Sequence, residues 1–341
     1  MKTKLLALVA TLGMVASASA VKINNNLSIN GFIDGSYQSV ENDTNIADSQ
    51  SLSVDEVELD FIVNVGNVSG EIHVDAGPSF NDRDGIGVEQ AHMTYSLDNG
   101  VSFTFGQFGS ALGFEREDPA GLYTFSRAYD SNTNNDTDAN GNDVVNGDDR
   151  VFNLGDVDSY AYEGLRIGYS VENLTLAASI QSAAADSRDV ESNDLDIEFS
   201  FAYTGFAGAT IGGGYRYDNE DNTSNEVDVL NLHISKQFGK LLLAGEYISS
   251  ESDNQDKDGY MILGDYDFND KVGVALRFSN NEQEGTRGDY EKLTIAPNYA
   301  ITESLGAILE YSDIEDDIVN HQSFNRISTN FHCAFCKSHD S

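Results

Sequence analysis

Charged side chains in this sequence repeatedly stand between apolar residues or glycines. Glu58 and Asp60, for example, alternate with Val57, Leu59 and Phe61. Successive side chains of an extended strand point to opposite faces, so such charges would gather on one face and the apolar side chains on the other. A strongly acidic face attracts cations and repels anions, which is a chemistry of selection rather than of reaction. The carboxylates with this spacing are Asp34, Glu58, Asp60, Glu71, Asp75, Asp196 and Glu198.

Three arginines, Arg166, Arg216 and Arg277, occupy the same kind of position, with Leu, Ile, Tyr or Phe on both sides. The alternation predicts that they share the polar face with the carboxylates. A register shift of one residue would turn them to the apolar face, so the assignment depends on the strand boundaries. Each single charge is equally well explained as a solvated side chain.

One short segment has the spacing of a calcium-binding loop. The segment Asp136-Thr137-Asp138-Ala139-Asn140-Gly141 supplies oxygens at alternating positions and then a glycine for a tight turn. The twelfth position is Gly147, where calcium loops carry a bidentate glutamate. A solvated acidic loop is therefore the favoured interpretation, and weak calcium binding by Asp136, Asp138 and Asn140 is the alternative.

The end of the sequence holds a second pattern that resembles a metal site. Cys333 and Cys336 lie close to His332 and His339, and this set superficially offers zinc-like ligands. One short cluster in a terminal segment is weak support for a zinc site, and a redox-inert or disordered tail is the preferred interpretation. No other cysteines are present, so no disulfide framework is expected in the body of the protein.

Catalytic motifs are missing from the rest of the chain. The remaining histidines show no metal-binding spacing, and no nucleophile motif is present. His73 and His92 fall on the polar face and are interpreted as polar lining residues. We therefore expect no enzymatic activity and no cofactor. A catalytic triad assembled from distant strands is the alternative that sequence alone leaves open.

The elements that must position these charges are strands, because the alternation of apolar and polar residues persists almost to the end of the chain. From Leu195 to Tyr203 and again from Val272 to Ser279, every second residue is apolar. The predicted strands lie near 27–39, 52–66, 68–77, 86–97, 100–109, 158–170, 173–183, 193–204, 207–218, 225–237, 240–250, 258–268, 271–281, 287–298, 303–313 and 320–331.

The connections between these strands alternate between short turns and longer polar loops. Short turns are expected at Asn67, Asp98-Asn99-Gly100, Glu172-Asn173, Gly205-Phe206, Phe238-Gly239, Asn269-Asp270 and Thr302-Glu303. Outer-membrane β-barrels have this asymmetry, with short periplasmic turns and long external loops. The pattern therefore favours an all-β, antiparallel transmembrane barrel of about sixteen strands over a soluble β-sandwich, which would also alternate.

Composition and the first residues indicate an exported protein. Lys2 and Lys4 precede an apolar run from Leu5 to Val15, and small residues follow, so residues 1–20 are predicted to be a signal peptide. No later segment approaches the run of about 18 apolar residues that a spanning helix needs. The chain has 19 Lys and Arg against 57 Asp and Glu, a net charge of −38, which excludes nucleic acid as a natural partner.

These features together resemble the Gram-negative general porins. In that family a sixteen-stranded barrel has a long third external loop folded into the lumen. Here the longest gap between strands runs from about Ser110 to Val157, directly after the predicted fifth strand, Val101-Ser102-Phe103-Thr104-Phe105-Gly106-Gln107-Phe108. The resemblance covers the mature chain to about Tyr311, and it rests on architecture more than on a unique motif.

The resemblance implies a function and a constriction. The protein would be an outer-membrane porin for passive diffusion of small hydrophilic solutes and ions, and its acidic lumen would favour cations. Its partners would be membrane lipid, lipopolysaccharide and two further copies of itself in a homotrimer. The family opposes basic wall residues to loop carboxylates, so Glu115, Glu117 and Asp118 would face Arg166, Arg216 and Arg277 across the pore.

The terminal sequence departs from the family, whose barrels end on a strand with a final aromatic residue. Here the barrel would span residues 21–331, and residues 332–341 would form an atypical tail after Phe331. Either a tail has been added or the native terminus has been replaced. Three alternatives remain. The chain could be a barrel scaffold with a blocked pore whose acidic loops bind calcium or a surface partner, a barrel with enzymatic activity, or a secreted soluble β-protein.

Overall fold

The structure is a computed structural model that describes residues 20–42, 49–76, 86–115, 122–129, 162–182, 195–217, 227–252, 256–283, 290–316 and 322–334. Its regular elements are strands: a two-residue strand, β1, and sixteen longer strands, β2 to β17. No helix within these residues is long and apolar enough to cross a membrane. The chain is therefore an all-β protein.

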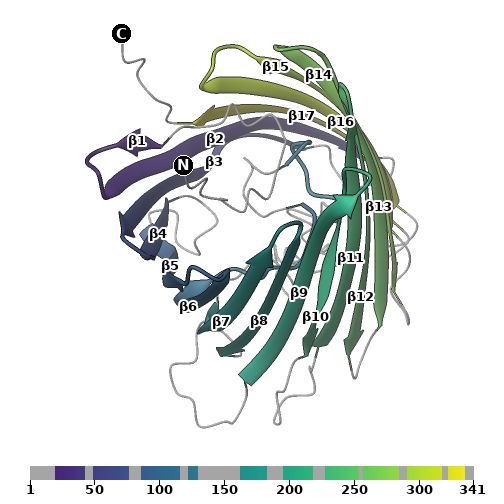
Figure 1. The fold of residues 1–341 in the computed structure, drawn as a ribbon. Coiled ribbons are helices and arrows are strands. Elements are labelled where there is room, and N and C mark those ends of the chain that lie inside the picture. The colour runs from purple at the N-terminus through teal and green to yellow at the C-terminus, as the bar shows by residue number, and fades with distance from the viewer. Residues whose placement is uncertain are drawn as a thin grey trace, which may run out of the picture.

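The sixteen long strands form one antiparallel barrel (Figure 1). Each pairs with its neighbours in sequence, and β17 also pairs with β2, from Phe324 opposite Asn42 to Ala334 opposite Phe32, so the pairing returns to its first strand. Closure leaves no unpaired edge. The strands are β2 (Leu27–Asn42), β3 (Ser49–Val65), β4 (Val68–Ala76), β5 (Ile86–Ser96), β6 (Val101–Phe108), β7 (Tyr162–Val171), β8 (Leu174–Ser182), β9 (Leu195–Phe206), β10 (Ala209–Tyr217), β11 (Val227–Phe238), β12 (Leu241–Ser252), β13 (Lys257–Asn269), β14 (Val272–Gln283), β15 (Tyr290–Ala300), β16 (Leu305–Asp316) and β17 (Gln322–Ala334).

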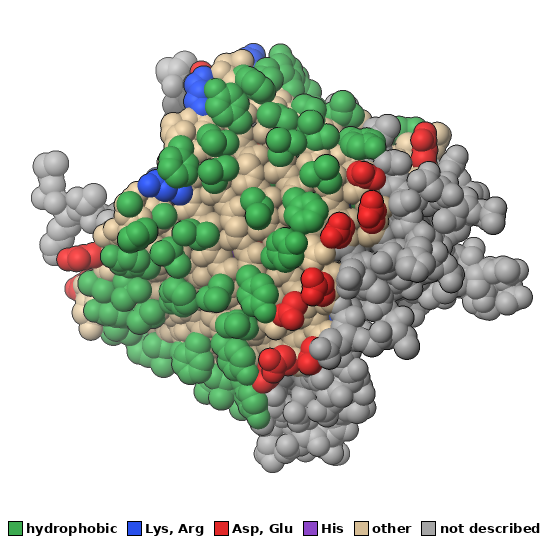
Figure 2. Space-filling view, turned by 90° about the vertical axis from the view of Figure 1, so that its right-hand side faces the viewer, with side chains coloured by type: hydrophobic (Ala, Val, Ile, Leu, Met, Phe, Trp, Pro, Cys, Tyr) green, Lys and Arg blue, Asp and Glu red, His purple; other side chains and the backbone are tan. Residues whose placement is uncertain are grey.

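Side-chain exposure distinguishes the two faces of the barrel wall. On β14 Leu276 is 51% exposed while the next residue, Arg277, is 1% exposed. On β3 Leu59 is 38% exposed and Asp60 is 8% exposed. Hydrophobic side chains spread over the outer surface of the strands, and acidic side chains gather along one edge of it (Figure 2). The apolar face is thus the outer face, as the sequence predicts.

The connections confirm the expected asymmetry and correct one turn. Gly66 and Gly239 lie in two of the short turns with φ of 63°, and no atom would contact an added Cβ at either residue, so the backbone conformation alone requires glycine there. The turn expected at Gly205-Phe206 lies instead at Ala207–Gly208, because β9 continues to Phe206. There Ala207 adopts a φ of 52°.

Both ends of the barrel differ slightly from the prediction. The short strand β1 (Val21–Lys22) pairs with the start of β2. The closing strand β17 continues past Phe331, so His332 and Cys333 belong to its backbone and the tail expected from residue 332 begins later. Residues 1–19, with most of the predicted signal peptide, lie outside the described residues, as do Cys336 and His339.

Candidate functional site: the lumen and its inner loop

The chain after β6 turns into the barrel and runs along its inner wall. Wall side chains accept hydrogen bonds from backbone N–H groups of residues 109–115. Glu198 on β9 accepts one at 2.9 Å, Asn231 on β11 one at 3.2 Å, and Glu246 on β12 one at 2.6 Å. Since these acceptors lie on successive parts of the wall, the loop follows the inner wall from the β6 side to the β12 side. This confirms the predicted inward fold for the part of the long loop that the structure describes.

The second described part of the loop, residues 122–129, lies against the next strands. Glu310 on β16 accepts hydrogen bonds from the Ser126 amide at 3.0 Å and from its hydroxyl at 2.6 Å. Lys292 on β15 donates from Nζ to the Arg127 carbonyl oxygen at 3.1 Å. We use the name inner loop for residues 109–115 and 122–129 together. The inner loop is held from β9 round to β16 by charged and amide side chains.

A buried ion pair joins both parts of the inner loop to the wall. Arg277 on β14 donates from one nitrogen to both oxygens of Glu115, at 2.6 and 2.9 Å, and from another to the Ser126 carbonyl oxygen at 2.7 Å. Glu115 also accepts from the Ala128 amide at 2.9 Å. The two charged side chains are 0% and 2% exposed. Removal of either partner would leave a buried charge without its counter-ion.

An apolar layer fills the space between the inner loop and strands β11 to β15. Inward positions on these strands carry aliphatic side chains where an open pore would carry polar ones. Because the loop covers them, they pack as a small core inside the barrel. The layer consists of Leu112, Tyr123, Ala128 and Tyr129 from the loop and Val229, Leu242, Ala244, Ile248, Met261, Leu263, Ala275 and Ala296 from the wall.

Two loop tyrosines in this layer have shifted pKa values. Burial raises the pKa of Tyr129 well above its usual range, and the Glu246 and Glu115 carboxylates raise it further because they oppose a second negative charge. Burial also raises the pKa of Tyr123, with Asp265 and Glu115 contributing in the same direction. Both phenols therefore stay neutral beyond the pH at which an exposed tyrosine ionises.

The other two arginines face the lumen as predicted, and each lies near a wall carboxylate on β9. Arg166 lies 3.6 Å from Glu198 and donates to the Gly109 carbonyl oxygen at 2.6 Å. Arg216 lies 3.4 Å from Asp196. Both carboxylates belong to β9, which pairs with β10 and is separated from β7 only by β8. The predicted pairing with the loop acids Glu117 and Asp118 stays a prediction. Glu117 and Asp118 lie outside the described residues.

The burial of Arg277 and Glu115 also corrects their expected role. As parts of an open constriction they would face solutes across the pore. Instead both are covered by the loop and the wall, and they serve as an anchor for the loop. A side chain with no exposed surface cannot contact a passing ion, although its charge still acts through the surrounding protein.

The predicted acidic wall occupies the inner face of the barrel. Asp34, Glu58, Asp60, Asp75, Asp196 and Glu198 are each 8% exposed or less, and the Glu71 side chain is 41% exposed. Sequence analysis missed Glu246 and Glu310, which also point inward. Each directly precedes an exposed tyrosine on its strand, so the alternation of inward and outward side chains would have identified both as inward-facing. The calcium pattern Asp136, Asp138 and Asn140 lies outside the described residues.

The comparisons with known proteins agree with this architecture. A family model described as Gram-negative porin matches residues 5–318. The outer membrane channel DcaP of Acinetobacter baumannii matches with a TM-score of 0.65 at 13% identity, over 93% of this chain and 99% of that one. The anion-selective porin from Comamonas acidovorans matches with a TM-score of 0.62 at 11% identity, over 91% and 99%.

A trimer form of OmpT, an outer membrane protein of Vibrio cholerae, matches with a TM-score of 0.58 at 12% identity, over 91% of this chain and 100% of that one. A search of curated protein sequences found no match. At these identities the solved structures establish the fold alone, whereas the family model spans most of the sequence. The chain therefore belongs to the Gram-negative porin family and is a porin of the outer membrane, built as a sixteen-stranded transmembrane β-barrel.

Proposed function

We propose that this porin lets small hydrophilic solutes and ions diffuse passively across the outer membrane, that it favours cations, and that it performs no catalysis. The observation that carries the proposal is the charge of the inner wall. Carboxylates line β2, β3 and β4, while Arg166, Arg216 and Arg277 each lie within 4 Å of another carboxylate, on β9 or on the inner loop. Since these cations are paired, the remaining acids give the lumen a negative potential.

The size of the passage follows from the inner loop. A sixteen-stranded barrel encloses an aqueous channel, and a loop bound along one part of its wall narrows that channel without filling it. The buried anchors keep the loop in one position. We therefore propose that the inner loop sets the upper size of the solute, and that the acidic wall sets the sign of the preferred charge.

We propose that the chain acts as a homotrimer surrounded by lipid and lipopolysaccharide. The apolar outer face meets the requirement for insertion, because large hydrophobic side chains are exposed all round the strands. Chemical crosslinking of the protein in native outer membranes would test this. Crosslinked species at three times the mass of one chain support the trimer, and a single-chain band alone contradicts it.

Reconstitution in a planar bilayer with a salt gradient tests the function. We expect stepwise currents and a reversal potential of the sign that marks cation selectivity, strongest at low salt where screening is weakest. An anion-selective reversal potential would contradict the role given to the acidic wall. A folded barrel that carries no current would instead favour the alternative function, a scaffold whose acidic loops bind calcium or a surface partner.

A further inference from the structure

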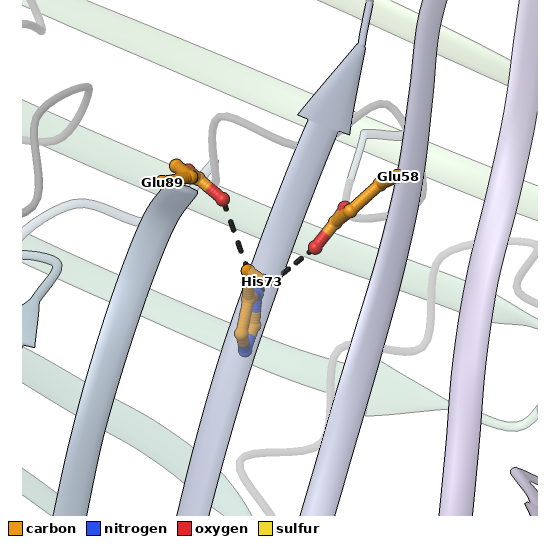
Figure 3. Close-up of side chains that lie close together, drawn as sticks. All are labelled: Glu58, His73 and Glu89. Carbon is orange, nitrogen blue, oxygen red and sulfur yellow. Dashed lines mark hydrogen bonds and ion pairs between the residues drawn. The ribbon is translucent and has the colours of Figure 1, made fainter. Parts of the chain in front are cut away.

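His73 on β4 is surrounded by carboxylates from three strands (Figure 3). Its Nδ1 atom lies 2.9 Å from Glu58 and 3.4 Å from Asp60, both on β3, and 3.9 Å from Glu89 on β5. On the other side of the ring, Nε2 lies 3.4 Å from Glu71. We propose that Glu58, His73 and Glu89, with Asp60, form a binding site for a divalent first-row transition metal ion on the lumen wall.

Nδ1 of His73 has more carboxylate oxygens around it than hydrogens to donate to them. An imidazole Nδ1 carries at most one hydrogen, so it can donate one hydrogen bond, and here that bond goes to Glu58. The Asp60 oxygen facing Nδ1 accepts no hydrogen bond from the described residues, although Asp60 is only 8% exposed. A buried carboxylate oxygen without a donor is costly. A cation at this point would satisfy several oxygens at once.

The distances suit coordination. The ligand atoms of Glu58, His73 and Glu89 all lie within 4.8 Å of one another. Around an ion with bonds of about 2.0–2.2 Å, neighbouring ligand atoms lie roughly 3.0–3.5 Å apart. The distances from Nδ1 to Glu58 and Asp60 are close to that range, and a small movement of the Glu89 side chain would bring its carboxylate oxygen into the range as well. The group is therefore near a coordination geometry.

Glu71 provides a feature that metal-binding histidines commonly have. Metal-bound histidines usually donate their second ring N–H to a carboxylate, which fixes the tautomer and the ring orientation. Here Nε2 can donate to Glu71, and release of the Nδ1 hydrogen on metal binding would leave the Nδ1 lone pair directed at the space among Glu58, Asp60 and Glu89. The arrangement thus contains both the ligands and the group that orients one of them.

A β-bulge brings Glu89 into this group. The pairing of β4 with β5 shifts between His73 and Val74: Gln90 lies opposite His73 and Val88 lies opposite Val74. Glu89 is therefore the extra residue. Strict alternation from the exposed Met93 would place Glu89 on the outer face, and the bulge turns it inward instead. Bulges often re-aim a side chain at a functional position.

The ligand types indicate the class of metal. Imidazole suits Zn²⁺, Co²⁺ and their neighbours, whereas Ca²⁺ and Mg²⁺ prefer oxygen ligands only. The nearby all-oxygen group Glu56, Glu58 and Asp75 would suit the hard cations better. Because both groups share Glu58, the dependence on His73 separates the proposed site from general attraction of cations to an acidic wall.

The test uses the full-length folded barrel in detergent, freed of metal with a chelator. Zn²⁺ binding is measured by calorimetry, and Co²⁺ is added as a spectroscopic probe of nitrogen ligation. We expect one ion per chain. His73→Asn and Glu58→Gln should each weaken binding at least tenfold, and Glu71→Gln about tenfold. His233→Asn is the matched control, since His233 on β11 also lies among lumen residues but outside this group, and it should leave binding unchanged.

Three results would overturn the proposal. These are no binding by the wild type, equal binding by the wild type and the His73→Asn variant, and equal competition by Ca²⁺ at the same concentration as Zn²⁺. The last two would mean attraction to the acidic wall only. Glu89→Gln provides an independent test should His73→Asn fail to fold, as judged by its gel mobility before and after heating. Loss of Zn²⁺ binding in Glu89→Gln, together with unchanged Zn²⁺ binding in His233→Asn, would still support the site.

Discussion

The two sides of the lumen wall use the same alternation of side chains for different purposes. On β11 to β16 many inward positions are apolar or hydrogen-bonded to the inner loop, as with Leu263 and Glu310. On β2 to β5 they carry acids and histidines, such as Asp34 and His73, and Gln90 on β5 accepts a hydrogen bond from the Gly109 amide. We therefore propose that one side supports the constriction and that the other gives the passage its negative charge. An inward charge can thus bond to the inner loop, as Glu310 does, or lie in a cluster of acids, as Glu58 does.

The largest effect is expected from breaking the anchor on the loop side. Arg277→Ala leaves Glu115 buried without its partner, and truncation of one member of such a pair costs about 3–5 kcal/mol. The inner loop should leave the wall, giving larger single-channel currents and faster uptake of larger sugars in a liposome-swelling assay. Lys271→Ala, at an exposed turn, is the control. Unchanged current and size limit in Arg277→Ala would show that this pair does not hold the constriction.

A second change should alter charge selection and leave pore size intact. Asp34→Asn combined with Asp75→Asn removes two inward charges from the acidic side. A unit charge at about 7 Å in water contributes about 0.6 kcal/mol, or roughly a threefold effect on ion preference, before screening. We expect the reversal potential to move toward zero with little change in the sugar size limit. The control pair Asp313→Asn and Glu315→Gln lies on the exposed outer face, and an equal shift there would contradict the role of the lumen charges.

A smaller effect is expected from Glu310→Gln. The carboxylate accepts hydrogen bonds from the amide and the hydroxyl of Ser126, and loss of its charge should weaken this contact by about 1–2 kcal/mol. Hydrogen exchange at residues 122–129 should become roughly tenfold faster, since 1.4 kcal/mol corresponds to a factor of ten. Glu315→Gln on the same strand should not change it. If residues 122–129 exchange hydrogen at the same rate in Glu310→Gln as in the wild type, the other contacts of the inner loop are sufficient to hold it on the wall.

The smallest effect concerns pH and Tyr129. Because the pKa of Tyr129 is higher when the loop is docked than when the phenol is exposed, the docked state binds this proton more tightly. The neutral phenol of Tyr129 therefore contributes fully to holding the inner loop on the wall below the ordinary tyrosine pKa of about 10. This contribution weakens as the pH rises beyond that value. We expect the current to increase between about pH 10 and 11 in the wild type, and less in Tyr129→Phe. An identical response in both proteins would assign the effect to other groups.

Much of the barrel was predictable because strand structure is local. The period of two in segments such as Leu195–Tyr203 identifies a strand and its outer face without knowledge of any partner. The turn at Gly205-Phe206 was misplaced by two residues because β9 continues to Phe206 and the turn uses Ala207 in a left-handed conformation, which residue type does not signal. The end of β17 was placed three residues too early, since its limit depends on pairing with β2.

The candidate site was predicted in part. Parity placed Arg166, Arg216 and Arg277 inside the barrel, but it could not say which acids would lie beside them. The partners Arg277 and Glu115 are 162 residues apart in sequence, so their contact depends on how the loop crosses a closed barrel. His73 was assigned to the lumen, yet its carboxylate neighbours require the register of β3 and β4 and the bulge in β5.

The sequence by itself determined the all-β architecture, the number of long strands, the apolar outer face and the acidic inner face. Each of these follows from the alternation of side chains along single strands and from the overall excess of carboxylates. Only the tertiary structure decided which charges are buried anchors, which face water, and which converge on one histidine. The physical reason is that pairing energies fall off over a few ångströms, and those short distances are set by closure, strand register and the path of the inner loop rather than by spacing along the chain.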